Sequence, residues 1–212
     1  MEELETLFKV KKNQVRMMMD RGYNVGDEAR LFEFTFNDFQ NLYLNFAKSQ
    51  NITIRDALNN IYFTPNKETT FVKYMNKTEK GQLGKDAVRS ISETLISNQK
   101  YNIRNVIIIT DSTFSSSAMN DLESMKAYNI QIFELIDFTY VPIDNYLVPK
   151  HEILTDEEAK KIQQSNKIPK IKVTDPIAKY YGAKKGNIFK IYRKDLTGTQ
   201  YVQESIAYRL VV

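Results

Sequence analysis

Cysteine is absent from the 212 residues, and histidine occurs once, as His151. Without cysteine the chain has no disulfide and no thiolate metal site, and a single histidine excludes a multi-histidine metal centre. His151 lies next to Pro149 and Lys150, and we interpret it as a packed or hydrogen-bonded residue. No apolar run approaches the roughly 20 residues of a membrane helix. The acidic start, Met-Glu-Glu-Leu-Glu, is unlike a secretory signal, so the sequence predicts a soluble intracellular protein.

Catalytic motifs are also missing. The hydroxyl-rich segment 112–117 has no G-x-S-x-G elbow around it, and Gly81 and Gly84 lack the spacing of a phosphate-binding loop. A magnesium-dependent nuclease would need carboxylates and a lysine on adjacent strands. The expected strands 61–64 and 106–110 contain neither Asp nor Glu. We therefore predict a chain with no catalytic residues of its own, no metal and no cofactor.

Charge is distributed unevenly along the chain. From Leu147 onward Lys and Arg outnumber Asp and Glu by 13 to 7, whereas residues 1–146 contain 17 basic and 19 acidic residues. A lysine-rich segment is often only a solvated face. The alternative is a surface that meets nucleic acid or an acidic partner.

The N-terminal part begins with two predicted helices. The apolar residues of the first helix form one stripe, and Gly22 supplies its C-cap. That stripe contains Leu4, Leu7, Phe8, Val15, Met18 and Met19. Residues 31–36 are expected to form a short aromatic strand or linker. Asn37 or Asp38 would then cap a second helix.

A small sheet is predicted next. Strands are expected at 61–64 and 71–75, and a short helix capped by Thr53 precedes them. Further on, a helix at 85–98, an apolar strand at 106–109, a helix at 116–128 and a strand at 130–138 alternate. A continuous apolar run such as 106–109 is typical of a central strand covered on both faces, and the alternation favours an α/β sheet with crossover connections.

Residues 141–149 contain two prolines and little periodicity, so we predict a linker between a domain at 1–140 and a module at 150–212. Thr155 and Glu158 form a capping box that opens a helix to about residue 165. In the stretch 168–194, Asp175 can cap a helix whose first residue is Pro176. Gly182 would end that helix. A basic turn and strands at 187–193 and 207–212 follow, which completes a small α+β module.

This last stretch resembles a known family. The segments DPIAKYYGAKKGNIFKIYRK, YLVPKHEILTDEEAKK and AYRLVV are similar to the C-terminal assembly module of the fifth, shared subunit of eukaryotic RNA polymerases. In archaeal RNA polymerases the corresponding subunit consists of that module alone. A weaker likeness extends upstream, to DRGYNV at 20–25 and SSAM at 116–119.

The chain also departs from this family at two places. Members often have Thr-Pro immediately before Ser-Ala-Met, where this chain has Ser115 and Ser116. The turn at 197–204 is longer than in other members. These departures suggest a divergent lineage, either a protist or a large DNA virus that encodes its own polymerase.

The resemblance implies a non-catalytic subunit of a multisubunit DNA-directed RNA polymerase. Its first domain would be a nuclease-like but inactive lower jaw beside downstream duplex DNA, and its C-terminal module would dock on the largest subunit. The DNA-proximal residues would be Arg21, Ser115, Ser116 and Ser117. The partner-binding residues would be His151, Asp175, Pro176, Tyr180, Tyr181, Lys184, Lys185, Arg193, Tyr208 and Arg209. The implied location is the nucleus for a cellular protein, or the host cytoplasm, viral factory, nucleus or virion for a viral one.

The alternative hypothesis is a free-standing nucleic-acid-binding or nuclease-like protein. Such a protein would hide the apolar side chains of Tyr180, Tyr181, Phe189 and 210–212 within its own fold. An assembly subunit would leave part of this set in one exposed patch. In either case we expect 210–212 to complete the terminal strand pairing, and we expect Lys184 and Lys185 to be exposed.

Overall fold

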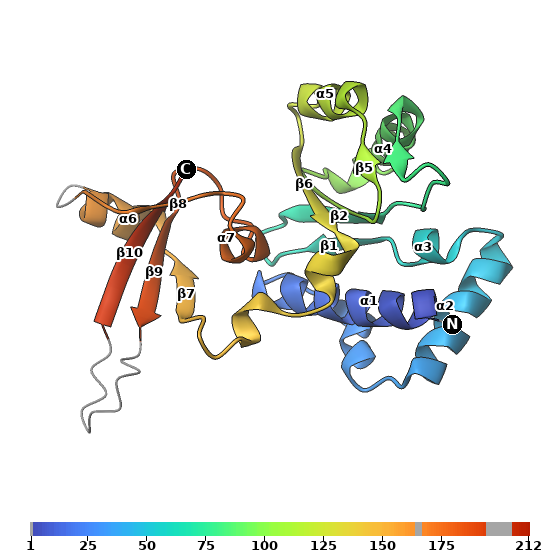
Figure 1. Cartoon of the computed structure of the whole chain (residues 1–212), viewed down its shortest axis with the longest axis horizontal. Helices are drawn as coiled ribbons and strands as arrows, with labels where there is room; N and C mark the ends of the chain where they lie inside the picture. The colour runs from blue at the N-terminus through green and yellow to red at the C-terminus, as the bar shows by residue number, and fades with distance from the viewer. Residues whose placement is uncertain (1, 164–166, 194–204) are drawn as a thin grey trace. The chain divides into compact units, whose positions relative to one another are not determined.

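The chain forms two compact units, Met1–Tyr140 and Val141–Val212. The computed structural model describes residues 2–163, 167–193 and 205–212, so the predicted long turn at 197–204 lies outside the described residues. Both units combine helices with a four-stranded sheet, which confirms the predicted α/β fold class (Figure 1). The first unit contains α1 (Glu2–Asp20), α2 (Phe36–Gln50), α3 (Ile54–Ala57), α4 (Lys85–Ser97) and α5 (Ser116–Ser124).

The sheet of the first unit has the strand order β1-β2-β4-β6. The hairpin of β1 (Asn60–Phe63) and β2 (Thr69–Tyr74) is antiparallel, whereas β2, β4 (Asn105–Thr110) and β6 (Asn129–Glu134) are parallel. As predicted, the apolar run of β4 is a central strand, and Val106, Ile107, Ile108 and Ile109 are all buried. Helices α4 and α5 cover one side of this sheet and α1 and α2 lie on the other (Figure 1).

Helix α1 ends as the sequence predicts, and its predicted apolar stripe is buried or half-buried except at Met19. Gly22 has a φ of 81°, and the amide of Tyr23 donates to the carbonyl of Met18, which closes the C-terminus. Met18 is buried as expected, but Met19 is 44% exposed. Two polar residues, Lys11 and Gln14, are buried on the same face instead.

Local chemistry corrects several other boundaries. Residues 31–36 form a connection and not a strand, since 31–32 end the 3-10 helix η1 (Gly26–Phe32), 33–35 form the turn, and Phe36 begins α2. The cap of α2 is Thr35, whose hydroxyl accepts from the amide of Asp38 in a capping box. The predicted strand at 130–138 stops at Glu134, and a 3-10 helix η3 (Leu135–Phe138) follows. Thr53 caps α3, as predicted. Two residues of β3 (Gln82–Leu83) pair with β5 (Thr113–Phe114) in a separate small sheet.

The second unit is a sheet of order β7-β9-β10-β8 with two helices. Its elements are η4 (Pro142–Asp144), β7 (Lys150–Ile153), α6 (Asp156–Gln163), β8 (Lys170–Ile171), α7 (Pro176–Tyr180), β9 (Ile188–Arg193) and β10 (Ser205–Val211). Strand β10 lies between β9 and β8, and Val211 is opposite Ile171, which confirms that the last residues complete the sheet. The core joins this sheet to α7 through Ile171, Ala178, Ala183, Phe189, Ile191 and Val211.

The helix caps of the second unit follow the sequence. The hydroxyl of Thr155 accepts from the amide of Glu158, and the Glu158 carboxylate accepts from the amide of Thr155. Asp175 caps α7 by accepting from the amide of Ile177 at 2.9 Å, with Pro176 as the first helical residue. Gly182 has a φ of 65°, a backbone conformation that favours glycine.

Candidate partner-binding site

The second unit contains an open pocket of about 1160 Å³ on the face of its sheet that also packs against α7. The pocket is lined from three directions: the segment 143–151, the N-terminus of α7, and strands β9 and β10. It brings together four of the predicted partner-binding residues, His151, Asp175, Arg193 and Arg209. Three isoleucines, Ile171, Ile177 and Ile191, are among the lining residues, and Ile171 and Ile191 also belong to the core of the unit.

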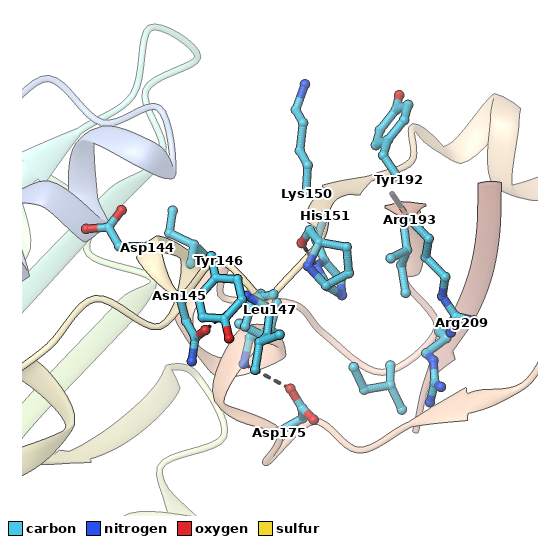
Figure 2. A pocket seen from close by; sticks show the side chains of 16 residues that line it. Asp144, Asn145, Tyr146, Leu147, Lys150, His151, Asp175, Tyr192, Arg193 and Arg209 are labelled. Carbon is cyan, nitrogen blue, oxygen red and sulfur yellow. Dashed lines mark hydrogen bonds between the residues drawn. The ribbon is translucent and has the colours of Figure 1, made fainter. Parts of the chain in front are cut away.

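Two arginines stand at one side of this pocket (Figure 2). In the strand register Arg193 is opposite Ser205 and Arg209 is opposite Phe189, so both side chains project from the same face of the sheet. Within residues 2–163, 167–193 and 205–212, neither guanidinium is in an ion pair. Arg209 donates to the carbonyl of Lys170 at 3.4 Å, which uses one of its five N–H groups.

His151 lies between the arginines and the segment before β7. The residue is 8% exposed, and its ring packs edge-on against Phe189 with a centroid distance of 5.6 Å. Nδ1 is 2.6 Å from the carbonyl of Pro149. Because that carbonyl can only accept, Nδ1 bears the hydrogen and Nε2 is the acceptor of the neutral ring. Burial lowers the pKa of His151, and the charges of Arg209 and Arg193 act in the same direction, while Asp175 opposes them.

The acidic and basic groups occupy different parts of the pocket. In Figure 2 Asp144 lies on the side away from Arg193 and Arg209. Asp175 is occupied in capping α7. Lys150 at the rim is paired with Glu152 at 2.6 Å, and the Tyr192 hydroxyl donates to the same carboxylate at 2.7 Å. The two arginines are therefore the cationic groups of the pocket that lack a carboxylate partner in the part of the chain that the structure describes.

The other predicted partner-binding residues do not line this pocket. Tyr180 is buried beside Tyr181, with ring centroids 5.6 Å apart. Pro176 is exposed at the start of α7, and Tyr208 is half-buried in β10, where it faces Lys190. Lys184 and Lys185 are exposed in the turn before β9, as predicted.

An assembly subunit was expected to expose part of Tyr180, Tyr181, Phe189 and 210–212 in one apolar patch, and the structure does not favour that expectation. Tyr180, Phe189 and Val211 are 4%, 0% and 1% exposed, because they belong to the interior of the second unit. Tyr181 and Leu210 are half-buried, and Val212 is 38% exposed. Other apolar side chains of the second unit are more exposed, among them Tyr146 (84%) and Leu147 (58%), which line the pocket, and Ile206 (51%), which does not. In the sequence, the only sign of the exposed pocket-lining side chains is an aromatic residue next to an aliphatic one between two prolines. We interpreted that segment as a linker.

The predicted DNA-proximal residues lie in the first unit. Ser115 caps α5, its hydroxyl accepting from the amide of Ala118 at 3.3 Å, and Ser116 and Ser117 are exposed in the first turn. The cap thus forms in a segment of three serines without a proline. Arg21 donates to Gln131 on β6 at 3.0 Å.

Buried cations of the first unit are paired within the unit. Lys11, fully buried, is 2.7 Å from Glu28 and donates to the hydroxyl of Tyr62 at 3.0 Å. Arg55, 4% exposed, donates to both carboxylate oxygens of Asp111 at 2.9 and 2.8 Å. Burial lowers the pKa of Lys11, and Glu28 opposes that shift.

Both carboxylate oxygens of Asp111 already accept hydrogen bonds from Arg55, so Asp111 is poorly suited to bind a metal ion. The hydrogen bonds from Arg55 lower the pKa of Asp111. Among the described residues, no group of three or more His, Asp or Glu side chains is arranged to hold a metal ion. In the same residues, no helix is both long and apolar enough to cross a lipid bilayer.

The fold defines a two-unit α/β protein whose C-terminal end is a small α+β module that contains the pocket. Residues 141–211, nearly the whole second unit, match the family model of the RNA polymerase Rpb5 C-terminal domain. An archaeal DNA-directed RNA polymerase subunit Rpo5, from Archaeoglobus fulgidus, is 51% identical over 74 residues, which cover 32% of this chain and 92% of that subunit.

Longer relatives align over both units. Subunit RPABC1 of DNA-directed RNA polymerases I, II and III from Caenorhabditis elegans is 26% identical over 224 residues, covering all of this chain and 99% of the relative. The DNA-directed RNA polymerase subunit 5-like protein 1 of Arabidopsis thaliana is 27% identical over 207 residues, 94% of each chain. This chain belongs to the RNA polymerase subunit 5 family.

Proposed function

We propose that this chain is a non-catalytic subunit of a DNA-directed RNA polymerase, anchored to the largest subunit by its second unit. The observation that supports this most strongly is the match of residues 141–211 to the Rpb5 C-terminal domain. An archaeal polymerase subunit is covered over 92% of its length by a third of this chain. A module that accounts for nearly a whole subunit elsewhere is the natural part to hold this chain in a polymerase.

The first unit, in this proposal, forms a jaw beside the downstream DNA duplex. Its support is local: α5 begins with exposed hydroxyls at Ser116 and Ser117. Hydroxyls and helix N-termini donate to phosphate oxygens without reading base sequence. Contacts of that kind suit an enzyme that must travel over every sequence.

The nucleus is the location that follows for a cellular eukaryotic polymerase subunit. The relatives described above come from a nematode, a plant and an archaeon. They do not support the alternative of a viral protein.

Affinity purification of the tagged full-length chain from its native source tests the proposal. We expect the largest polymerase subunits to be recovered in equimolar amounts, as measured by quantitative mass spectrometry. A chain ended after Tyr140 is the matched control, and it should recover none of them because it lacks the second unit. Recovery of the full-length chain alone, or with nucleic acid only, would overturn the proposal in favour of a free-standing nucleic-acid-binding protein.

A second measurement addresses the DNA contact. In the assembled polymerase, Ser116→Glu with Ser117→Glu should weaken retention of downstream duplex in a salt-dependent way, since both changes add negative charge near phosphates. Glu79→Gln, an exposed position of the same unit, is the control and should leave retention unchanged. Equal retention by the two proteins across the salt range would remove the DNA contact from the proposal.

A further inference from the structure

We propose that α1, α2 and β1 of the first unit form a carboxylate-binding site that Glu28 fills from within the chain, and that a carboxylate of another molecule can take the place of Glu28. Glu28 belongs to residues 25–34, which include η1 and which we call the strap. The inference concerns the first unit alone. It goes beyond the proposed polymerase role and does not depend on it.

Three side chains outside the strap direct donors at the Glu28 carboxylate. Nζ of Lys11 is 2.7 Å from one carboxylate oxygen, and the hydroxyl of Tyr62 donates to the other. The hydroxyl of Tyr43 is a third hydrogen-bond partner. Burial raises the pKa of Tyr43, and the charge of Glu28 acts in the same direction, so this hydroxyl keeps its proton at neutral pH. One ammonium and two hydroxyl groups thus surround a carboxylate whose side chain is only 16% exposed.

The donors of Lys11 and Tyr62 are held in place by contacts that do not involve the strap. Lys11 donates to the carbonyl of Leu58 at 3.0 Å and to Oε1 of Gln14 at 3.1 Å. Nε2 of Gln14 donates to the hydroxyl of Tyr62 at 3.1 Å, and the hydroxyl of Tyr74 donates to Oε1 of Gln14 at 3.2 Å. The site is therefore preorganised, and these donors stay in position when Glu28 leaves.

The strap is tied to the rest of the unit at few points. Its backbone hydrogen bonds are local and span two or three residues. Leu31 is buried, and Lys12 donates to the carbonyl of Phe32 at 3.3 Å. Within the residues that the structure describes, the other hydrogen bonds and ion pairs between the strap and the helices and strands around it are those of Glu28. A segment with so few ties can open locally while the sheet stays folded.

Two other buried cations of the first unit take their carboxylates from positions closer to the sheet. Arg55 pairs with Asp111, which directly follows strand β4, and Lys73 pairs with Asp56 inside helix α3. Those carboxylates are carried by elements that pack on one another. Glu28, by contrast, leaves the site whenever the strap opens.

The chemistry of the site selects a carboxylate as the replacement. A buried ammonium without a counter-charge is strongly destabilising, so the site favours an anion once Glu28 has left. Hydrogen bonds from tyrosine hydroxyls to a carboxylate are charge-assisted and stronger than those between neutral groups. A carboxylate also offers two oxygens, one for Lys11 and one for Tyr62, as Glu28 does, whereas a chloride ion is a single acceptor.

Acetate rescue of the full-length variant Glu28→Ala tests the site. The change removes the atoms of an acetate molecule and leaves Lys11 in place. At pH 7 we expect sodium acetate to raise the melting temperature by at least about 3 °C more than sodium chloride at equal concentration, in a saturable way, because a ligand of the folded state stabilises it by mass action. If the variant is unfolded without ligand, acetate should refold it, as measured by circular dichroism. Equal effects of the two salts would overturn the proposal.

Two further proteins test the roles of Lys11 and Glu28. Lys11→Met with Glu28→Ala lacks the ammonium, so acetate should act on it no more than chloride does. In the unmodified chain Glu28 competes from within the molecule, and the acetate midpoint should be at least about tenfold higher than in Glu28→Ala. Rescue of the double variant, or equal midpoints in the unmodified chain and Glu28→Ala, would overturn the assigned roles.

Hydrogen exchange tests whether the strap opens. In the unmodified chain the amides of Glu28 and Glu33 should exchange at least about 100-fold faster than that of Ile108 in β4, through local opening. Strap amides that exchange as slowly as Ile108 would overturn the proposal, because no external carboxylate then enters.

Exchange in Glu28→Ala also separates two sources of the carboxylate. Acetate fits beneath a closed strap and should slow exchange at Glu33. A capped Gly-Glu-Gly peptide needs an open strap, so it should speed exchange at Glu33 and raise the melting temperature, whereas Gly-Gln-Gly should do neither. Rescue by acetate without any effect of Gly-Glu-Gly would support the site for small free carboxylates and overturn it for the acidic side chain of another chain.

Discussion

The two units of this protein use positive charge in different ways. In the first unit the buried cations, Lys11, Arg55 and Lys73, are each paired with a carboxylate of the same unit. In the second unit Arg193 and Arg209 line a pocket with no carboxylate partner in the described part of the chain, and Lys184 and Lys185 are exposed. A buried cation with an internal partner fixes the fold, whereas a cation at a pocket wall is available to another molecule. The same residue types thus serve the fold in one unit and, in our proposal, assembly in the other.

The largest expected effect comes from ending the chain after Arg209. This change removes Leu210, Val211 and Val212, and with them the pairing of β10 to β8. Val211 alone is fully buried, and burial of an aliphatic side chain contributes about 1.5–3 kcal/mol. We expect the second unit to unfold and the first to remain folded, measured by residue-resolved hydrogen exchange. A shortened chain with protected amides in β9 would show that the last strand is dispensable.

The second-largest expected effect is a loss of stability when the buried ion pair of Lys11 and Glu28 in the first unit is broken. Glu28→Gln leaves the ammonium of Lys11 without a counter-charge, which typically costs about 3 kcal/mol or more of unfolding free energy. The double change Lys11→Met with Glu28→Gln should restore most of that loss, since it removes the buried charge as well. Urea unfolding measures both variants. Glu5→Gln, at an exposed position of α1, is the control, and an equal loss in the control would contradict the assigned role of the pair.

The pH dependence of stability tests the pair of Arg55 and Asp111. The hydrogen bonds from Arg55 hold the folded-state pKa of Asp111 below its ordinary value of 3.8. Below that value the unfolded chain takes up a proton that the folded chain resists, so stability is present above about pH 4 and is lost as the pH falls towards the folded-state pKa. Asp111→Asn should be less stable at neutral pH and should show a flatter acid limb.

The urea midpoint between pH 2 and 7 measures this difference. Glu79→Gln is the matched control, because Glu79 is exposed in the same unit. Parallel curves for Asp111→Asn and the unmodified protein would contradict the prediction.

The smallest expected effect on stability is that of Lys184→Ala with Lys185→Ala. Both side chains are exposed, and the turn that contains them is held by the amide of Lys184 donating to the Asn187 side chain at 2.7 Å. The melting temperature should stay within about 2 °C, since exposed substitutions away from caps and networks are nearly neutral. Recovery of the polymerase or its retention of DNA should nevertheless weaken. If both remain unchanged across a salt titration, these lysines are only a solvated face.

Much of the fold was predictable because its signals are local. The apolar run of β4, the capping box at Thr155 and the order Asp175, Pro176, Gly182 each act within a few residues, and the structure confirms them. Some errors are local, such as the cap of α2 at Thr35, but the burial of polar residues on α1 involves partners that are distant in sequence. Lys11 lies on an apolar face because Glu28 and Tyr62 meet it there, and neither can be identified from the helix pattern alone.

The pocket was only partly predictable for the same reason. His151, Asp175, Arg193 and Arg209 were expected to bind a partner from the family resemblance, but nothing local predicts that they line one cavity. Their convergence depends on β10 pairing with both β9 and β8. The segment 141–149, which its two prolines led us to predict as a linker, contributes Tyr146 and Leu147 to the lining of the pocket, and no local pattern indicates this.

The lengths of the strands in the sheet of the second unit affect how readily that sheet can pair with other chains. Its two edges are β7, with four residues, and β8, with two, whereas the inner strands β9 and β10 have six and seven. Short edge strands offer few free backbone groups to the strands of other chains, which is one way in which proteins avoid aggregating edge to edge. The short edges therefore lower the tendency of this sheet to pair with strands of other chains while its edges are uncovered.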